Sequence, residues 1–163
     1  MTLLSPSGTA NPFYAEHGWT GDGSAKLKLP SAATQWSLAS GDKLMPGSPI
    51  TLEWNNGEGL LFRRTISIDD GYLFTVRQEV ENTTTSPVTL YPYALISRHG
   101  EPTLQSFYIL HEGLIGVLGD EGLQEIDYDD AVEDRQIAFS NTTGGWLGIT
   151  DKYWAAVIVP AQN

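Results

Sequence analysis

Residues 50–82 read ITLEWNNGEGLLFRRTISIDDGYLFTVRQEVEN, and this stretch predicts three consecutive antiparallel strands. Residues 50–54 and 60–68 flank Asn55-Asn56-Gly57. Because an Asn-Gly pair favours the positive φ angles of a tight hairpin turn, these two segments should pair. Asp69-Asp70-Gly71 predicts a second turn, and residues 72–81 then alternate between apolar and polar side chains. That alternation is typical of a strand with one buried face and one solvated face.

The rest of the chain carries the same signals in shorter runs. Runs rich in Phe, Tyr, Ile and Val predict further strands at 88–97, 105–111, 114–118, 123–128 and 136–140. Pro92 inside the first of these indicates an edge strand or a bulge. Residues 144–160, GGWLGITDKYWAAVIVP, predict an apolar hairpin in which Trp146 and Trp154 are core residues. The first 30 residues, rich in Gly, Ser, Pro and Asn, indicate an irregular loop.

Helical signals are weak throughout. No segment sustains an apolar period of 3.6 residues, although residues 129–139 could form one helical turn with Asp129 or Asp130 as its cap. The predicted architecture is therefore all-β and antiparallel, with two packed sheets and little helix.

Composition excludes several classes of function. Nine Lys and Arg face 20 Asp and Glu, which gives a net charge of −11. Nucleic acid and anionic lipid surfaces would be repelled by such a chain. The absence of cysteine excludes a disulfide framework and thiol catalysis. No run approaches the roughly 20 apolar residues that a membrane-spanning helix needs, so we expect this chain itself to be soluble.

The histidines do not point to a catalytic or metal site. His17, His99 and His111 are scattered, and a metal or acid–base site requires such groups to converge in space. Glu16 and His17 are neighbours, but adjacent residues of a strand point to opposite faces. We therefore interpret each histidine as a surface or turn residue.

The acidic segment from Gly119 to Asp134 raises the question of calcium. Eight carboxylates lie in it, but DYDDAVEDR at 127–135 lacks the central glycine of a calcium loop. A solvated, charged segment is the better interpretation. The five Trp and seven Tyr could line a sugar-binding cleft, but most occupy alternating strand positions, which favours a core. We predict no catalytic, cofactor-binding or metal-ligating residue.

Four segments in register carry a family resemblance. LLFRRTISIDDGYLFTVRQEVENTTTSPVTL at 60–90 resembles part of the periplasmic domain of the bacterial membrane protein insertase YidC. TANPFYAEHGW at 9–19, FYILHEGLIGVLG at 107–119 and the hairpin at 144–160 resemble pieces of the same family in the same order. The upstream loop SPSGTANPFY at 5–14 is most similar to alphaproteobacterial members.

The resemblance implies a fold and a place in a larger protein. The fold would be a β-supersandwich related to galactose mutarotase. Residues 1–163 would form a single periplasmic β-sandwich domain, as an internal fragment without its flanking strands and without any transmembrane helix. The parent would be an inner-membrane protein, and the arginine of its insertion groove would lie in the absent membrane core.

The resemblance also implies a function. The parent would insert and fold inner-membrane proteins, alone or beside the Sec translocon. This domain would act by protein–protein interaction without a cofactor, with the accessory proteins SecD and SecF and nascent membrane proteins as partners.

Two other functions stay open at this point. One is a carbohydrate-binding module, which predicts aromatic side chains exposed on one sheet face. The other is an aldose-epimerase-like enzyme, which needs a His acid and a Glu base on one sugar. The available pairs join His99 or His111 to Glu101 or Glu112, and none carries a recognisable motif.

Overall fold

The computed structural model describes residues 4–23, 26–100, 111–134, 136–139 and 143–161. Contacts divide the chain into two units: unit 1 is Met1–Glu16 with Ala94–Asn163, and unit 2 is His17–Tyr93. The described residues form ten strands, one α-helix of seven residues and one short 3-10 helix. The prediction of an all-β, antiparallel fold with little helix is confirmed. No helix among these residues is long and apolar enough to cross a membrane.

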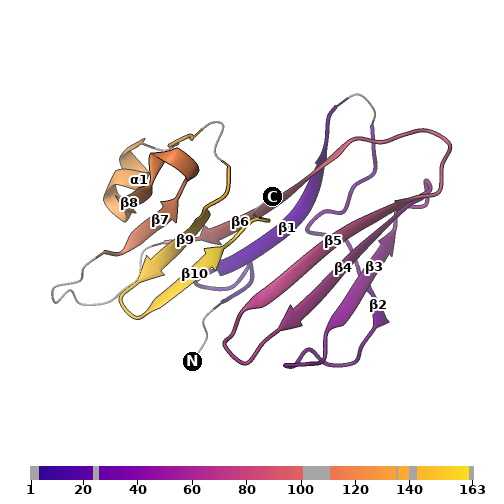
Figure 1. Ribbon diagram of the computed structural model, residues 1–163, viewed down its shortest axis with the longest axis horizontal. Helices are drawn as coiled ribbons and strands as arrows, with labels where there is room; N and C mark the ends of the chain where they lie inside the picture. Colours follow the sequence, from indigo (N-terminus) through magenta and orange to yellow (C-terminus); the bar gives the residue numbers. More distant parts are fainter. Residues whose placement is uncertain (1–3, 24–25, 101–110, 135, 140–142, 162–163) are drawn as a thin grey trace. The chain divides into compact units, whose positions relative to one another are not determined.

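Unit 2 contains a four-stranded antiparallel sheet in the order β2-β3-β4-β5. Its strands are β2 (Ser37–Ser40), β3 (Ile50–Asn55), β4 (Leu60–Ile68) and β5 (Phe74–Asn82), and they lie side by side in Figure 1. Trp54 pairs with Phe62, and Phe62 pairs with Val80, so one register places three apolar side chains in a row across the sheet. The strands predicted from residues 50–82 are confirmed.

The β3–β4 turn is built around a buried asparagine. Asn56 is 1% exposed, and its Oδ1 accepts the backbone N–H groups of Glu58 at 2.7 Å and Leu60 at 3.0 Å. Its Nδ2 donates to the carbonyl oxygen of Lys28 at 3.2 Å. Gly57 takes the positive φ that the turn requires. The side chain therefore fixes the hairpin and ties it to the segment before β2.

The β4–β5 turn follows the same chemistry at an exposed site. Asp69 Oδ1 accepts the N–H groups of Gly71 and Leu73 at 2.8 and 2.9 Å. The apolar face predicted for residues 72–81 is not buried along its whole length, because Tyr72 is 82% and Phe74 52% exposed. Only the Val80 end of β5 packs against the core.

The core of unit 2 is aromatic. Phe62 is fully buried, Leu60 is 2% exposed and Trp19 is 6% exposed. The ring of Phe62 lies 5.2 Å from that of Trp19 and 5.6 Å from that of Trp54. These distances are within the range of favourable ring pairs. Trp36 also packs on this cluster, with its ring 6.4 Å from that of Trp19.

One predicted loop is a strand. The first 30 residues contain β1 (Phe13–Gly21), which pairs with β6 (Leu90–Arg98) in a two-stranded sheet. The sequence of β1 does not alternate and includes two glycines, so pattern alone predicts a loop. One of them, Gly18, lies inside the strand because a Cβ there would come within 2.5 Å of the Tyr93 ring. Pro92 lies within β6, which has one partner strand among the described residues, as an edge strand would.

Unit 1 contains a second antiparallel sheet, in the order β10-β9-β7-β8. Its strands are β7 (Gly113–Val117), β8 (Leu123–Asp127), β9 (Trp146–Asp151) and β10 (Trp154–Ile158). The helix α1 (Tyr128–Asp134) contacts β7 and β8. The strands predicted near 114–118 and 123–128 and the hairpin at 144–160 are confirmed.

Two strand predictions in unit 1 have other outcomes. Residues 136–139 are irregular, so the strand predicted at 136–140 is wrong where the structure describes it. Ile137 and Phe139 instead line a pocket on the neighbouring sheet, because a short apolar run can cover a sheet as well as extend one. The strand predicted at 105–111 falls almost wholly outside the described residues.

The tryptophans of the last hairpin are not both core residues. Trp146 is half-buried, and Trp154 is 47% exposed. Trp154 begins β10, the outermost strand of the sheet, and among the described residues β10 has a neighbouring strand on one side only. The prediction of a buried Trp154 is therefore wrong, because alternation does not say whether a strand lies centrally or at an edge.

Two substitutions test this difference in burial. We expect Trp19→Ala to lower the free energy of unfolding by about 3–5 kcal/mol, the usual cost of removing a buried aromatic side chain. Trp154→Ala should cost about 1–2 kcal/mol, because half of its surface already faces solvent. Urea denaturation followed by circular dichroism measures both values. Equal losses in the two variants would contradict the burial described here.

Candidate functional site

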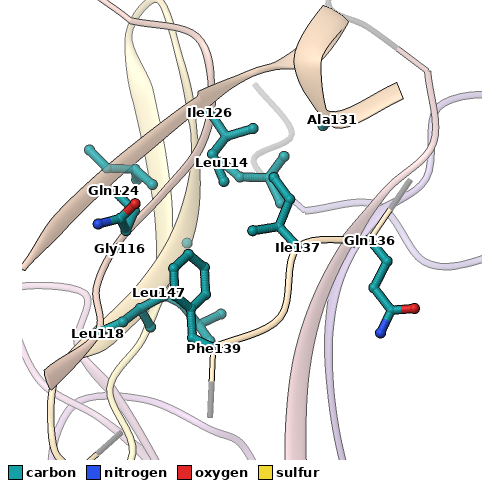
Figure 2. A pocket seen from close by; sticks show the side chains of 12 residues that line it. Leu114, Gly116, Leu118, Gln124, Ile126, Ala131, Gln136, Ile137, Phe139 and Leu147 are labelled. Atoms are coloured by element: carbon teal, nitrogen blue, oxygen red, sulfur yellow. The ribbon is translucent and has the colours of Figure 1, made fainter. Parts of the chain in front are cut away.

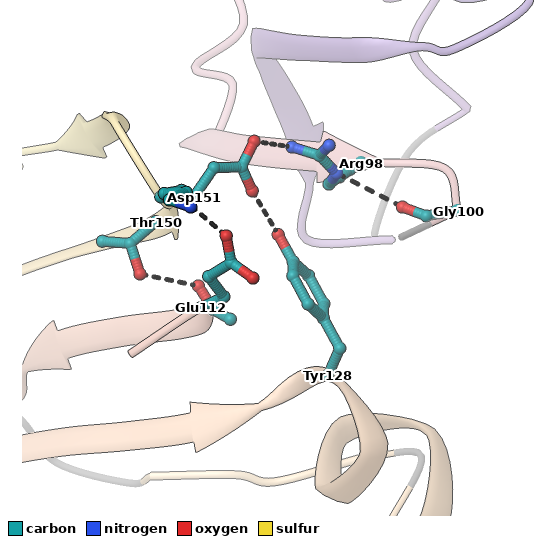
Figure 3. A network of polar contacts seen from close by, with 8 residues as sticks. Arg98, Gly100, Glu112, Tyr128, Thr150 and Asp151 are labelled. Atoms are coloured by element: carbon teal, nitrogen blue, oxygen red, sulfur yellow. Dashed lines mark hydrogen bonds and ion pairs between the residues drawn. The ribbon is translucent and has the colours of Figure 1, made fainter. Parts of the chain in front are cut away.

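A largely buried ion pair joins strands that are far apart in the sequence (Figure 3). Arg98 of β6 pairs with Asp151 of β9, and their side chains are only 17% and 15% exposed. The hydroxyl of Tyr128, the first residue of α1, donates to the other carboxylate oxygen of Asp151 at 2.9 Å. The Arg98 guanidinium also lies over the ring of Phe13, at 5.1 Å from its centroid. We call Arg98, Asp151 and Tyr128 the polar node.

Within the polar node, the contacts fix which group donates and which group accepts each hydrogen bond. Burial raises the pKa of Tyr128, and its hydrogen bond to Asp151 raises it further, so the hydroxyl keeps its proton and remains a donor. Next to the node, Glu112 accepts the backbone N–H of Lys152, the residue after β9, at 2.8 Å. Each of these groups has a partner, so the arrangement fastens β6, β9 and α1 together.

The histidines are placed apart from one another. His99 is exposed, and its backbone N–H donates to the carbonyl oxygen of Pro12 at 2.9 Å. The ring of His111 lies between the carboxylate of Asp127 at 3.0 Å and the carbonyl oxygen of Leu114 at 3.1 Å. Glu112, the next residue, binds the Lys152 N–H. Glu101 lies outside the described residues.

His17 is half-buried in β1. Burial lowers its pKa from 6.5, and the positive charge of Arg64 lowers it further. The Arg64 guanidinium donates to the carbonyl oxygen of His17 and lies 4.8 Å from the centroid of the Trp36 ring. These contacts pack β1 against β4, which is a structural role.

The carboxylates of the acidic segment, residues 119–134, do not converge on one site. It forms the 3-10 helix Gly119–Glu121, strand β8 and helix α1, and all eight carboxylate residues are exposed. Across the described residues, no group of three or more His, Asp or Glu side chains is placed to hold a metal ion.

An apolar pocket of about 270 Å³ lies in unit 1 (Figure 2). Strands β7, β8 and β9 contribute most of its lining, Ala131 adds to it from α1, and Ile137 and Phe139 lie across it. In Figure 2 the side chains of Leu114, Leu147 and Phe139 point toward one another around the hollow. Apart from Gln124 and Gln136, every lining residue is apolar. A pocket of this kind suits an apolar group.

Strand β10 is the second apolar surface of unit 1. It has no charged residue, and within the described part of the chain it pairs only with β9. Trp154 is 47% and Val157 44% exposed, and these two side chains point to opposite faces of the sheet. The backbone of β10 therefore offers an open edge to an extended segment.

Comparison with known proteins gives one consistent result. The family model of the YidC periplasmic domain matches residues 1–163. A protein of Methylorubrum extorquens named "Membrane protein insertase YidC" is 55% identical over 100% of this chain and 27% of its own length. The protein of the same name from Nitrobacter hamburgensis is 53% identical over 98% of this chain and 26% of its own length. That from Rhizobium meliloti is 47% identical over 99% of this chain and 27% of its own length.

The chain therefore spans about a quarter of the length of the curated relatives it matches. No solved structure matches it.

The burial of His17 makes stability depend on pH. Its pKa is lower in the folded chain than 6.5, so below that pH the unfolded chain takes up a proton that the folded chain does not. We expect the free energy of unfolding to fall as the pH drops through 6.5, and to fall less in His17→Gln. Urea denaturation on either side of that pH measures it. His99→Gln is the control, and an unchanged pH dependence in His17→Gln would contradict the assignment.

The open edge of β10 predicts self-association. Because an uncharged, apolar edge strand pairs with any available strand, we expect the purified chain to form dimers or larger species at high concentration. Val157→Lys places a charge on this edge and should shift the chain toward monomer. Light scattering coupled to size-exclusion chromatography measures both. A parent chain that stays monomeric at every concentration would refute the prediction.

Proposed function

Because the chain belongs to the family of YidC periplasmic domains, we propose that it acts in the periplasm by binding other proteins, within a membrane protein insertase. The observation that carries this proposal is the match of the family model to the whole chain. The relatives are named for membrane protein insertion, and this chain spans about a quarter of their length. Its own contribution would be to hold partners of that reaction.

Two surfaces of unit 1 support a binding role. The apolar pocket and the open edge of β10 both offer apolar surface to a partner. Nascent membrane proteins are rich in apolar segments, so they suit such surfaces. We propose them as partners, together with SecD and SecF of the Sec translocon.

The proposal extends to the organisation of the domain. Residues 1–163 would form part of one β-supersandwich whose remaining strands come from other parts of the parent. The antiparallel sheets of units 1 and 2 are compatible with that fold.

Neither alternative has comparable support. An aldose epimerase would need a His and a Glu converging on one sugar, but His99 is exposed and His111 is held by Asp127. A sugar-binding module would need an aromatic platform. The aromatic cluster around Phe62 instead forms the core of unit 2, with Phe62 and Trp19 buried.

Site-specific crosslinking tests the proposal. The chain would replace the matching segment of the Methylorubrum extorquens relative, with a photoreactive amino acid at Val157. In membranes containing SecD, SecF and an arrested nascent membrane protein, we expect a crosslink to one of these three proteins. The control carries the photoreactive group at Glu58, an exposed turn residue of unit 2. Labelling at Val157 no stronger than at Glu58, or turnover of aldose anomers by the purified chain, would overturn the proposal.

A further inference from the structure

We propose that the apolar pocket of unit 1 binds one large apolar side chain of an extended, positively charged segment of a partner protein. This inference rests on the proposed function in one respect, since it takes the partner to be a protein. It adds where on the domain the partner binds and which chemistry is recognised.

The pocket exists because one strand position lacks a side chain. Leu114, Gly116 and Leu118 point to the same side of β7 and the residue after it, and all three line the pocket. With glycine in the middle, a hollow remains between the two leucines. A Cβ at Gly116 would lie 2.8 Å from the carbonyl oxygen of Trp146 on β9, so the position does not accept a larger residue without moving the sheet. The hollow is thus built into the backbone.

The size of the pocket matches a large side chain. A cavity of about 150 Å³ in another protein holds benzene. The 270 Å³ available here would admit an aromatic ring or a branched aliphatic chain with space for its connection to a backbone. The walls are already partly open to water, because Leu114 is 40%, Ile137 42% and Leu147 43% exposed. An apolar side chain that entered would cover this surface, and the covering of apolar surface favours binding.

Polar groups at the pocket suit a peptide backbone. Gln124 and Gln136 are the two polar residues among those that line it. The Gln124 amide donates to the carbonyl oxygen of Glu121 at 2.8 Å, which holds the side chain in place. Amide groups can both donate and accept hydrogen bonds, as the peptide groups of an extended segment require.

Charge selects the class of segment. From Gly119 to Asp134 the chain carries eight carboxylates and no Lys or Arg. This segment forms β8 and α1, which supply Gln124, Ile126 and Ala131 to the pocket. A field of this sign attracts Lys and Arg and repels acidic peptides and anionic lipid head groups. The favoured ligand is therefore an apolar residue flanked by basic residues.

Peptide titration followed by nuclear magnetic resonance tests the proposal on the isolated chain. The probe is a pentapeptide with phenylalanine between two pairs of lysines. We expect its binding to shift the amide signals of Gly116, Gln124 and Ala131 and to leave the signals of unit 2 unchanged. Replacing the central phenylalanine by alanine should weaken binding about tenfold or more. A peptide with glutamates in place of the lysines should bind more weakly still, and added salt should weaken the lysine peptide.

Variants of the chain locate the site. Ala131→Leu would fill the pocket from α1 and should weaken binding of the lysine–phenylalanine peptide about tenfold. The matched control is Val132→Leu, the next residue of the same helix, which is 71% exposed and does not line the pocket. Asp130→Asn combined with Glu133→Gln should weaken binding of the lysine peptide without changing the circular dichroism spectrum.

The outcomes separate this inference from the proposed function. Equal binding of the lysine and glutamate peptides would overturn it, as would signal shifts outside the pocket or an effect of Val132→Leu equal to that of Ala131→Leu. Uncharged benzene binding better than the lysine peptide would identify a general apolar cavity and would also overturn it. The crosslinking at Val157 does not depend on the pocket, so either proposal can fail while the other stands.

Discussion

The burial of Phe62 between the rings of Trp19 and Trp54 is the contact on which unit 2 depends. Phe62 lies on β4, between strands β3 and β5, and its cross-strand partners Trp54 and Val80 fix the register of those two strands around it. A shift of one residue would turn Phe62 to the solvated face and bring Arg63, which pairs there with Glu53 and Glu81, into the core. The same ring holds β1 against the sheet through Trp19.

Sequence predicts this fold where the information is local. The hairpins of residues 50–82 and 144–160 follow from turn residues and alternation that lie within a few positions of one another. Strand β1 could not be predicted in this way, because Gly18 is explained by the ring of Tyr93, 75 positions away. The exposure of Trp154 could not be predicted either, because the position of a strand at the centre or edge of a sheet depends on which other strands join that sheet.

The candidate sites were less predictable than the fold. Arg98 and Asp151 are separated by 53 residues, and nothing in their local sequence sets them apart from surface charges. The pocket has one signal in the sequence, which is the glycine in the middle of the apolar run Leu114–Leu118. A glycine in a strand is also typical of bulges and bends, so this signal is not specific. The spacing of His99 and His111 predicted that the two residues do not converge on one site, and the structure places His111 against Asp127 and leaves His99 exposed.

The buried side chain of Asn56 has a consequence for the chemical ageing of the protein. Asparagine followed by glycine is prone to deamidation, in which the backbone nitrogen of the glycine attacks the side-chain amide carbon and releases ammonia. In the folded chain the Asn56 amide is held by Glu58, Leu60 and Lys28 and is shielded from water. Cyclisation would require this turn to open first. The rate of ammonia loss at Asn56 would therefore report how often the β3–β4 hairpin unfolds locally.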